Sequence, residues 1–321
     1  MAVEIVKPGL ETAVQDYPGR LGHLSAGFPP SGPLDHWSFR LANLLVGNHA
    51  GAAALECQFV GPSLLFHAPA VVAITGGDMA PTLETAPIEL WKSFAVASGQ
   101  TLQLGAAKTG ARAYIAVAGG FEIEAFMGSK STFRKAGVGG HNGNALAAGD
   151  VLDIGHGKGV PGRSVPPERR PAITNARDWT IELVAGPHDD WLDPQGRANF
   201  VNGPWRLSGK SDRTGFRLEG PPISFSRIAT EKAPENGSDP SNIIDYGYPI
   251  GGINLGGQTP IVLVNDSLTM GGFICPYTVP HAAFWKLAQA RPGNIIRFRE
   301  ISVEAAQEMR RAIDAQLAVP V

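Results

Sequence analysis

The sequence has few cysteines, few charges and no apolar run long enough to cross a membrane. Two cysteines, Cys57 and Cys275, exclude a framework of several disulfides and a zinc site built from cysteines. The 27 basic and 29 acidic residues are spread along the chain, so no basic stretch marks a surface for nucleic acid or an anionic membrane. The N-terminus also lacks the apolar core of a signal peptide. These absences favour a soluble, cytoplasmic protein.

Standard catalytic and nucleotide-binding motifs are missing as well. The sequence has no GxxxxGK[ST], no GxGxxG that opens a helix after a strand, no HExxH and no GxSxG. The chain therefore shows no standard means of binding ATP or a dinucleotide, no serine nucleophile of the usual hydrolase type and no metal site. Any chemistry must depend on dispersed polar groups or on parts that a partner supplies.

Glycine and proline are abundant instead, with 40 Gly and 26 Pro beside an ordinary apolar content of 43%. Short apolar or β-branched segments bounded by Gly, Pro or Asp predict strands at 71–75, 101–104, 113–117, 151–154, 180–184, 260–264 and 295–298. Helices are expected only after Asp35, from about Pro280 and after Ser302. Because strands do not alternate with long helices, a mainly β fold of barrels or sandwiches is favoured over a doubly wound sheet.

The chain divides into two parts that resemble each other weakly. Residues 156–178 are rich in Pro, Gly and charge, which predicts a linker or an exposed crossing loop between a unit at 1–155 and a unit at 179–321. Three short similarities recur in the same order: GPSLLF at 61–66 with GPPISF at 220–225, GGF at 119–121 with GGF at 271–273, and GDVL at 149–152 with GNII at 293–296. We therefore predict two related β-units, the second ending in a helix.

Two polar regions of the first part are candidates for a site. Asp16 lies among turn-forming residues, where it either accepts turn amides or takes part in chemistry. Glu56 lies in an apolar stretch and is either a partnered buried acid or a functional one. A stretch rich in Ser, Thr and Gly is either a solvated hairpin or a cradle for a carboxylate or oxyanion. Its candidate residues are Ser129, Lys130, Thr132, Arg134, Gly139 and Gly140.

The densest polar region lies in the second part. Asp212, Arg213 and Arg217 fall close together in a strand-like stretch. Asp266 follows the predicted strand 260–264, so it either caps the next turn or stands at a strand end where a rigid scaffold presents groups to a cleft. Asn254 and Gln258 offer amide groups suited to a planar polar substrate.

Long motifs over nearly the whole chain resemble one family. In order, they are QDYPGRLGH, GFPPSGPLD, SFRLANLLVGN, GPSLLFH, GSKSTF, VGGHNG, SDRTGFRLEGP, DPSNIIDYGYPIGGINLGGQTP, NDSLTMGGF and WKLAQARPGNIIRF. They are similar to the second half of the carboxyltransferase domain of urea carboxylase. The same module occurs as a free-standing protein called allophanate hydrolase subunit 2, urea amidolyase-related protein or the C subunit of 5-oxoprolinase. The resemblance implies two cyclophilin-like β-barrel units with a few short helices.

The resemblance also implies a function, namely one subunit of a biotin-dependent carboxyltransferase that moves CO₂ from carboxybiotin to urea or a related amide or guanidine nitrogen. The chain lacks a biotinylated Met-Lys-Met segment, so the biotin is expected on a partner and ATP is expected to act only through partners. These partners are a subunit-1-type protein, a biotin carboxylase and a biotin carrier. Two alternatives stay open: the C subunit of an ATP-dependent 5-oxoprolinase, and a non-catalytic regulatory protein that binds a subunit-1-type partner.

Under the carboxyltransferase interpretation, the candidate residues divide among three tasks. The donor carboxylate is assigned to Arg134 and to Arg213 or Arg217, with Asp212, Ser129 and Thr132 nearby in sequence. The N–H groups of the acceptor, and removal of its proton, are assigned to Asp16, Asn254 and Asp266. The anion left on biotin is assigned to the backbone amides of Gly271 and Gly272 or to those of Gly139 and Gly140.

Overall fold

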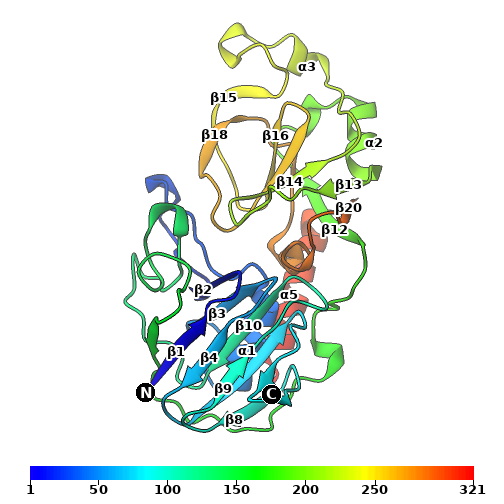
Figure 1. Cartoon of the computed structure of the whole chain (residues 1–321). Helices are drawn as coiled ribbons and strands as arrows, with labels where there is room; N and C mark the ends of the chain where they lie inside the picture. Colours follow the sequence, from blue (N-terminus) through cyan, green and yellow to red (C-terminus); the bar gives the residue numbers. More distant parts are fainter. The chain divides into compact units, whose positions relative to one another are not determined.

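The computed structural model describes residues 1–321, which form two compact units (Figure 1). The first unit comprises Met1–Leu21, Pro30–Asn175 and Asp314–Val321, and the second comprises Gly22–Pro29 and Ala176–Ile313. Both are built mainly from strands with few helices, which confirms the predicted fold class. None of the helices combines the length and apolar character that a membrane crossing requires.

Two antiparallel sheets make up the first unit. The six-stranded sheet has the order β11-β1-β4-β9-β6-β7, and the five-stranded sheet has the order β2-β3-β10-β5-β8. The strands are β1 (Ala2–Lys7), β2 (Glu11–Gln15), β3 (Ala54–Gln58), β4 (Ser63–Phe66), β5 (Ala70–Gly76), β6 (Thr82–Leu83), β7 (Ala86–Pro87), β8 (Ser93–Val96), β9 (Thr101–Gln103), β10 (Arg112–Val117) and β11 (Val151–Asp153). The helix of this unit, α1 (His36–Leu45), packs on β5 and β10.

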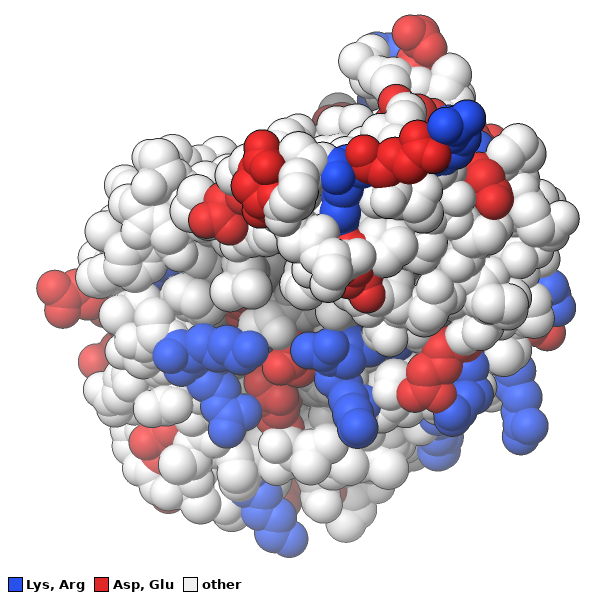
Figure 2. Space-filling model, turned by 90° about the horizontal axis from the view of Figure 1, so that it is seen from above, with Lys and Arg blue, Asp and Glu red and all other residues white.

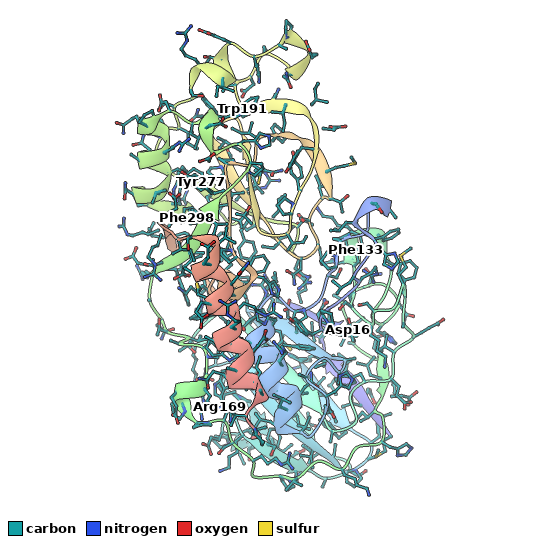
Figure 3. All side chains as sticks on the ribbon, turned by 180° about the vertical axis from the view of Figure 1, so that it is seen from behind. Asp16, Phe133, Arg169, Trp191, Tyr277 and Phe298 are labelled. Carbon is teal, nitrogen blue, oxygen red and sulfur yellow. The ribbon has the colours of Figure 1, made fainter.

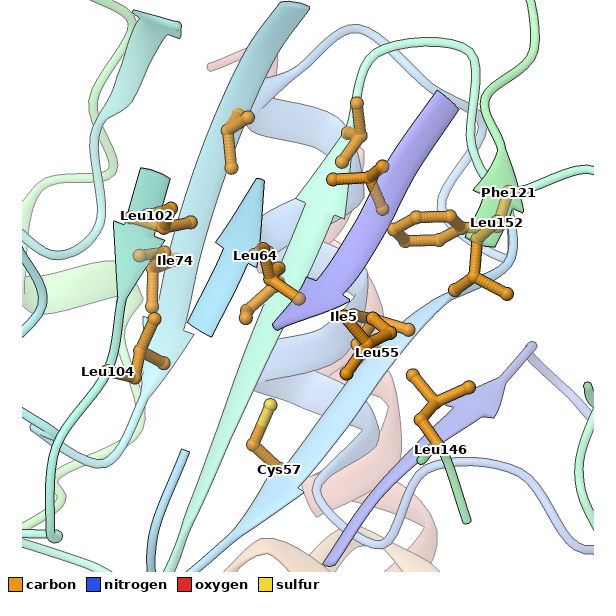
Figure 4. Close-up of a cluster of buried hydrophobic side chains, with 14 of the residues drawn as sticks. Ile5, Leu55, Cys57, Leu64, Ile74, Leu102, Leu104, Phe121, Leu146 and Leu152 are labelled. Carbon is orange, nitrogen blue, oxygen red and sulfur yellow. The ribbon is translucent and has the colours of Figure 1, made fainter. Parts of the chain in front are cut away.

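The core of the first unit draws side chains from both sheets, as Figure 4 shows. Ile5 of β1 and Leu64 of β4 come from one sheet, and Leu55 of β3 and Ile74 of β5 come from the other. Strand β10 is buried along its whole length because alternate side chains face this core and helix α1. This double burial explains why β10 lacks the polar alternation of an exposed strand.

Helix α1 begins where the sequence predicts. Asp35 accepts hydrogen bonds from the Ser38 backbone N–H at 2.9 Å and from Ser38 Oγ at 2.6 Å, which caps the helix. Glu56 on β3 accepts hydrogen bonds from Tyr114 Oη at 2.8 Å and from the Leu34 N–H at 2.9 Å. Of the two interpretations of Glu56, the partnered buried acid is therefore the one that the structure shows.

The second unit is a closed barrel of seven strands in the order β12-β19-β16-β17-β14-β13-β20. The strands are β12 (Asp178–Ala185), β13 (Trp205–Leu207), β14 (Gly215–Glu219), β16 (Gly252–Gly256), β17 (Thr259–Leu263), β19 (Tyr277–Thr278) and β20 (Ile295–Glu300). A separate pair of strands, β15 (Asn242–Gly247) and β18 (Met270–Phe273), forms a two-stranded antiparallel sheet. The helices are α2 (Pro194–Asn202), α3 (Arg227–Thr230), α4 (Phe284–Gln289) and the part of α5 (Val303–Ala318) up to Ile313, because residues from Asp314 belong to the first unit.

Aromatic stacking and one buried ion-pair group stabilise this barrel. Phe200 of α2 stacks on Tyr277 at 4.8 Å and on Phe298 at 5.4 Å between ring centroids, and Figure 3 marks the latter two residues. The buried carboxylate of Glu182 on β12 accepts hydrogen bonds from Lys286 at 2.8 Å and Arg299 at 2.7 Å. Burial acts to raise the pKa of Glu182, but the bonds from these two cations outweigh it and hold the pKa below the ordinary 4.5.

Residues 156–178, for which the sequence predicts a linker or an exposed crossing loop, lie mostly within the first unit. Val165 is fully buried, and its backbone N–H donates to the Trp91 carbonyl at 2.9 Å. Arg169, only 8% exposed, donates to the Gln316 carbonyl at 2.7 Å and to the Pro320 carbonyl at 3.0 Å. Neither unit is therefore one continuous stretch of sequence.

The three short similarities between the halves correspond only partly in structure. GDVL at 149–152 and GNII at 293–296 both lead from a turn into a strand, β11 or β20. GGF at 119–121 follows β10 as a turn, whereas GGF at 271–273 lies within β18. GPSLLF runs into β4, whereas GPPISF at 220–225 follows β14 without forming a strand. Gly- and Pro-rich sequences serve turns of several kinds, so short matches between them do not fix equivalent positions.

Candidate functional site

A cavity of about 510 Å³ opens in the first unit between loops that join its strands and helix. Its walls come from the loop after α1, the turn after β10, residues 125–130 and residues 156–158. The lining side chains and glycines are Asp16, Gly47, Asn48, His49, Gly51, Ala52, Ala53, Gly119, Gly120, Phe121, Ala125, Gly128, Lys130, His156, Gly157 and Lys158. This volume is typical of a site for a small molecule.

Glycine at two positions lets the walls of this cavity approach each other. Gly119 has φ +92°, and a Cβ atom there would lie 2.1 Å from the Gly155 carbonyl oxygen. A Cβ atom on Gly157 would lie 2.2 Å from the Gly119 nitrogen. Because both clashes are with backbone, larger residues would push the segment 155–158 away from the turn after β10.

Asp16 is fully engaged by groups of the protein. Its Oδ1 accepts hydrogen bonds from Ser129 Oγ and Ser131 Oγ, each at 2.5 Å, and its Oδ2 accepts one from the Lys130 backbone N–H at 2.8 Å. Figure 3 marks the position of Asp16 in the first unit. The contacts join the end of β2 to the turn 129–131, so the predicted residues Asp16 and Ser129 do meet. In this arrangement Asp16 anchors the turn that carries Lys130.

The Gly-rich stretch beyond this turn is packed against its neighbours. Thr132 Oγ1 donates to the Val14 carbonyl at 2.9 Å, and the Gly140 N–H donates to the Lys130 carbonyl at 3.2 Å. A Cβ atom on Gly139 would lie 2.1 Å from the Ser131 carbonyl oxygen. These glycines therefore permit close contact with residues 130–132, and the Gly140 amide is already used within the fold.

Arg134 lies away from the lining of the cavity. Its side chain is 61% exposed, and its guanidinium lies 3.7 Å from the carboxylate of Glu11. The structure therefore brings Asp16, Ser129 and Thr132 into one packed region but leaves Arg134 at the surface. On the face shown in Figure 2, Lys and Arg side chains stand in several small groups with Asp and Glu beside them.

In the second unit, Arg213 and Asp266 form an ion pair that is largely shielded from solvent. Arg213 Nε donates to Asp266 Oδ2 at 2.8 Å and Nη2 donates to Oδ1 at 3.3 Å, while the Asp266 N–H donates to the Arg213 carbonyl at 2.9 Å. The Asp266 side chain is only 5% exposed. The pair ties the turn after β17 to the turn before β14, so both residues shape the polar edge of the barrel.

The other polar residues predicted for this region are Asp212, Arg217 and Gln258. Asp212 accepts from the Thr214 N–H at 2.8 Å and so closes the turn before β14. The side chain of Arg217, on β14, is exposed. Gln258 accepts from the Ile223 N–H at 2.7 Å and donates to the Ile223 carbonyl at 3.0 Å, so its amide is consumed within the fold.

Asn254 on β16 carries an unsatisfied acceptor. The residue is only 5% exposed, and its Oδ1 has no hydrogen-bond partner in the protein. Its side chain bonds to the hydroxyl of Tyr248, which also accepts from the Phe273 N–H at 2.7 Å and donates to the Phe273 carbonyl at 3.1 Å. Burial raises the pKa of Tyr248. A Cβ atom on Gly271 would lie 3.0 Å from the Tyr248 ring, so β18 approaches this hydroxyl closely.

Sequence reasoning missed His188, which follows β12. Its Nδ1 accepts from the Cys275 N–H at 3.1 Å, so the neutral ring carries its proton on Nε2. Burial lowers the pKa of His188, which favours this neutral form. The ring lies edge-on to Tyr246 at 5.1 Å and to Trp191 at 5.8 Å between centroids. His188 comes soon after the predicted strand 180–184, as Asp266 comes soon after the strand 260–264. Its position at a strand end could therefore have identified it as a candidate in the same way.

Two kinds of chemistry find no support in this geometry. No three His, Cys, Asp or Glu side chains gather closely enough to hold a metal ion. Burial raises the pKa of Cys57 to about 12 and that of Cys275 to about 11, so neither is a thiolate near neutral pH.

Comparison with known proteins places the chain among carboxyltransferase domains. Urea amidolyase of Lachancea kluyveri is 40% identical over 98% of the chain, which spans 18% of that protein. The C subunit of 5-oxoprolinase from Escherichia coli K12 is 33% identical over 96% of the chain and 94% of that protein. The crystal structure of Kluyveromyces lactis urea carboxylase matches with a TM-score of 0.92 and 37% identity, over 99% of the chain and 29% of that structure.

The chain thus spans less than a fifth of the urea amidolyase relative and nearly all of the 5-oxoprolinase relative. Residues 26–300 match a single family model, and this range includes most of both units. Because this match and the full-length relatives agree, the chain belongs to the carboxyltransferase domain family, subdomain A and B.

Proposed function

We propose that the chain is one component of a biotin-dependent carboxyltransferase that acts on urea or a related amide or guanidine nitrogen. The observation that carries this proposal is the similarity to urea amidolyase and urea carboxylase over almost the whole chain, at a higher identity than to the 5-oxoprolinase relative. The partners in this proposal are a subunit-1-type protein, a biotin carboxylase and a biotin carrier, and the chain spans only 18% of the urea amidolyase relative and 29% of the urea carboxylase structure.

The buried Asn254 Oδ1 supports a site for a planar N–H donor. A buried carbonyl oxygen without a partner costs free energy, and a ligand N–H would satisfy it. Urea, guanidine and the ureido ring of biotin all present such N–H groups. Bound carboxybiotin supplies the carboxyl group, whose bond to the biotin nitrogen breaks as one to the acceptor nitrogen forms and the acceptor's proton passes to biotin.

The other candidate residues divide into positioning groups and groups that remain open to a ligand. We assign Asp16, with Ser129 and Thr132, to holding the turn 129–131 and not to proton removal, because its oxygens already accept three hydrogen bonds. Asp266 orients the Arg213 guanidinium, which would attract the donor carboxylate. The remaining candidates for that carboxylate and for the anion left on biotin are Arg134, Arg217, Gly139, Gly271 and Gly272, whereas the Gly140 N–H and the Asp212 carboxylate are engaged within the fold.

A second candidate function is that of the C subunit in a 5-oxoprolinase. The observation that favours it is the share of each relative that the chain covers. This share is 94% for the Escherichia coli protein and only 18% for urea amidolyase. The two proposals differ in what the partners supply: the first requires carboxybiotin, and the second requires ATP without biotin.

The test is reconstitution of the full chain with a subunit-1-type partner. One assay adds biotin carboxylase and carrier and measures carboxylation of urea and guanidine, and the other measures ATP-dependent loss of 5-oxoproline. The variant Asn254→Ala should lower carboxylation strongly, whereas Asn175→Ala, at an exposed position, should leave it unchanged. Turnover of 5-oxoproline alone would replace the first proposal with the second.

A further inference from the structure

The cavity of the first unit gathers cationic and N–H-bearing side chains that no acidic residue engages. Lys158, His49 and His156 line it without any side-chain hydrogen bond or ion pair to the protein. Lys130 Nζ has a single long bond, 3.4 Å, to the Phe121 carbonyl. The only acidic residue in the lining is Asp16, and its oxygens are occupied by two hydroxyls and a backbone amide. The lining therefore carries two ammonium groups, Lys130 and Lys158, against the single carboxylate of Asp16, and it keeps a net positive charge.

The backbone at Lys130 is held firmly beside the cavity. Its N–H donates to Asp16 and its carbonyl accepts from Gly140. The flanking Ser129 and Ser131 are fully buried. Lys158 follows Gly157, whose backbone lies directly against Gly119. The two lysines thus belong to segments far apart in sequence. The backbone of each segment is held beside the same opening, and the Lys158 side chain is exposed.

The size and walls of the cavity favour an organic ligand over a simple ion. About 510 Å³ is far more than an inorganic anion fills. Besides its polar groups, the lining includes Ala52, Ala53 and Ala125, which offer apolar contact to a small body, whereas the Phe121 side chain packs in the core of the unit. The backbone of Gly119 and Gly120 allows a flat molecule to approach closely.

We propose that this cavity binds a small organic carboxylate, with Lys130 and Lys158 holding the carboxylate and the body lying against Ala125 and the glycine backbone. The inference stands apart from the choice between the two functions above, because N-carboxybiotin and 5-oxoproline share this chemistry: each carries a carboxylate beside a cyclic amide or urea. For N-carboxybiotin, the cavity offers the carboxylate an alternative to Arg213. His49 and His156 add N–H donors at the same opening. The site uses residues of the first unit alone.

Direct binding to the purified full chain tests the proposal without any enzymatic assay. Calorimetric titration would compare 5-oxoproline with 2-pyrrolidone, the same ring without its carboxylate, and with 2-oxoimidazolidine-4-carboxylate, a cyclic urea that keeps one. We expect both carboxylates to bind and 2-pyrrolidone not to bind measurably. The tighter of the two carboxylates identifies the lactam or the urea as the natural ring. Inorganic phosphate and bicarbonate are expected to compete only weakly.

Two lysine variants and one matched control locate the ligand. Lys130→Met and Lys158→Met should each weaken carboxylate binding about tenfold or more, as expected for loss of a charge-assisted hydrogen bond. Lys108→Met removes an exposed lysine of the same unit outside the cavity and should change nothing. Circular dichroism and thermal unfolding would verify that each variant is folded. Equal affinity in all three variants, tighter binding of phosphate than of either carboxylate, or no binding at all would overturn the proposal.

Discussion

Replacing Asp266 with alanine should destabilise the second unit markedly, because the change leaves the Arg213 guanidinium without its carboxylate partner. Both carboxylate oxygens face that guanidinium, at 2.8 and 3.3 Å. The side chains of Asp266 and Arg213 are only 5% and 11% exposed. Water therefore cannot readily replace the lost carboxylate, and the folded state bears the cost of removing it from a shielded cation.

The magnitude follows from this burial. Breaking a buried ion pair by removing one partner costs about 3–5 kcal/mol of unfolding free energy, whereas an exposed pair contributes about 1 kcal/mol or less. Asp266→Ala also removes the two side-chain bonds between the turn after β17 and the turn before β14 and leaves the backbone bond between them. We therefore expect a loss of at least about 3 kcal/mol. The double variant Arg213→Met, Asp266→Leu removes both charges and should recover most of it.

Urea unfolding followed by tryptophan fluorescence measures this loss, since Trp179, Trp191, Trp205 and Trp285 all belong to the second unit. Asp178→Ala, at an exposed position on β12 in the same unit, is the matched control and should change the unfolding free energy little. A cost below about 1 kcal/mol for Asp266→Ala, or a double variant as unstable as the single one, would refute the view that Asp266 anchors Arg213.

Three further predictions concern stability and reactivity. Because the pKa of Glu182 is lowered in the folded protein, its stabilising contribution is present above the ordinary pKa of about 4.5 and is lost as the pH falls through the folded value. Acid unfolding of Glu182→Gln should accordingly show a weaker pH dependence than wild type over this range. Gly140→Ala should destabilise the first unit by about 2–4 kcal/mol in chemical unfolding, because the added Cβ would lie 1.8 Å from the Thr132 hydroxyl. The control Gly128→Ala, whose Cβ would meet no atom within 4 Å, should cost about 1 kcal/mol. Cys57 and Cys275 should resist a thiol reagent at pH 8 until denaturant is added, and rapid labelling of the native protein would contradict their burial.

Local signals in the sequence were sufficient for most elements of the fold. The helices expected after Asp35, from about Pro280 and after Ser302 are present as α1, α4 and α5, and the side chains of Asp35 and Ser302 cap the first and the last of them. All seven predicted strands are present, as β5, β9, β10, β11, β12, β17 and β20. Each of these signals depends on residues a few positions apart, which is the range over which side-chain caps and strand patterns act.

Features that depend on distant residues could not be predicted in this way. The parallel pairing of β12 with β20 joins Asp178 to Ile295, and no local pattern specifies such a partner. The carboxylate of Asp16 bonds to Ser129 and Ser131, more than one hundred positions along the chain. Local sequence therefore left Asp16 with two alternative roles, and only the three-dimensional contacts identify it as the anchor of the turn.

The candidate cavity was missed for a related reason. Lys158 and His156 lie in the segment for which composition predicts a linker, and such segments seldom suggest a binding wall. Their proximity to Lys130 depends on the glycine contact between Gly119 and Gly157. Residue type alone suggested which groups could bind an anion, but the packing of backbone against backbone decides which of them share an opening.

The exchange of segments between the units has a consequence for anyone who wishes to dissect the chain. A fragment that stops at residue 175 loses Asp314, the partner of Arg40 at 2.7 Å, and the carbonyls to which Arg169 donates. A fragment that starts at residue 176 loses Gly22–Pro29, which belongs to its own unit. Such pieces are better regarded as complementary halves of a split protein than as domains. Mixed together, they are expected to recover the native fold more readily than either does by itself.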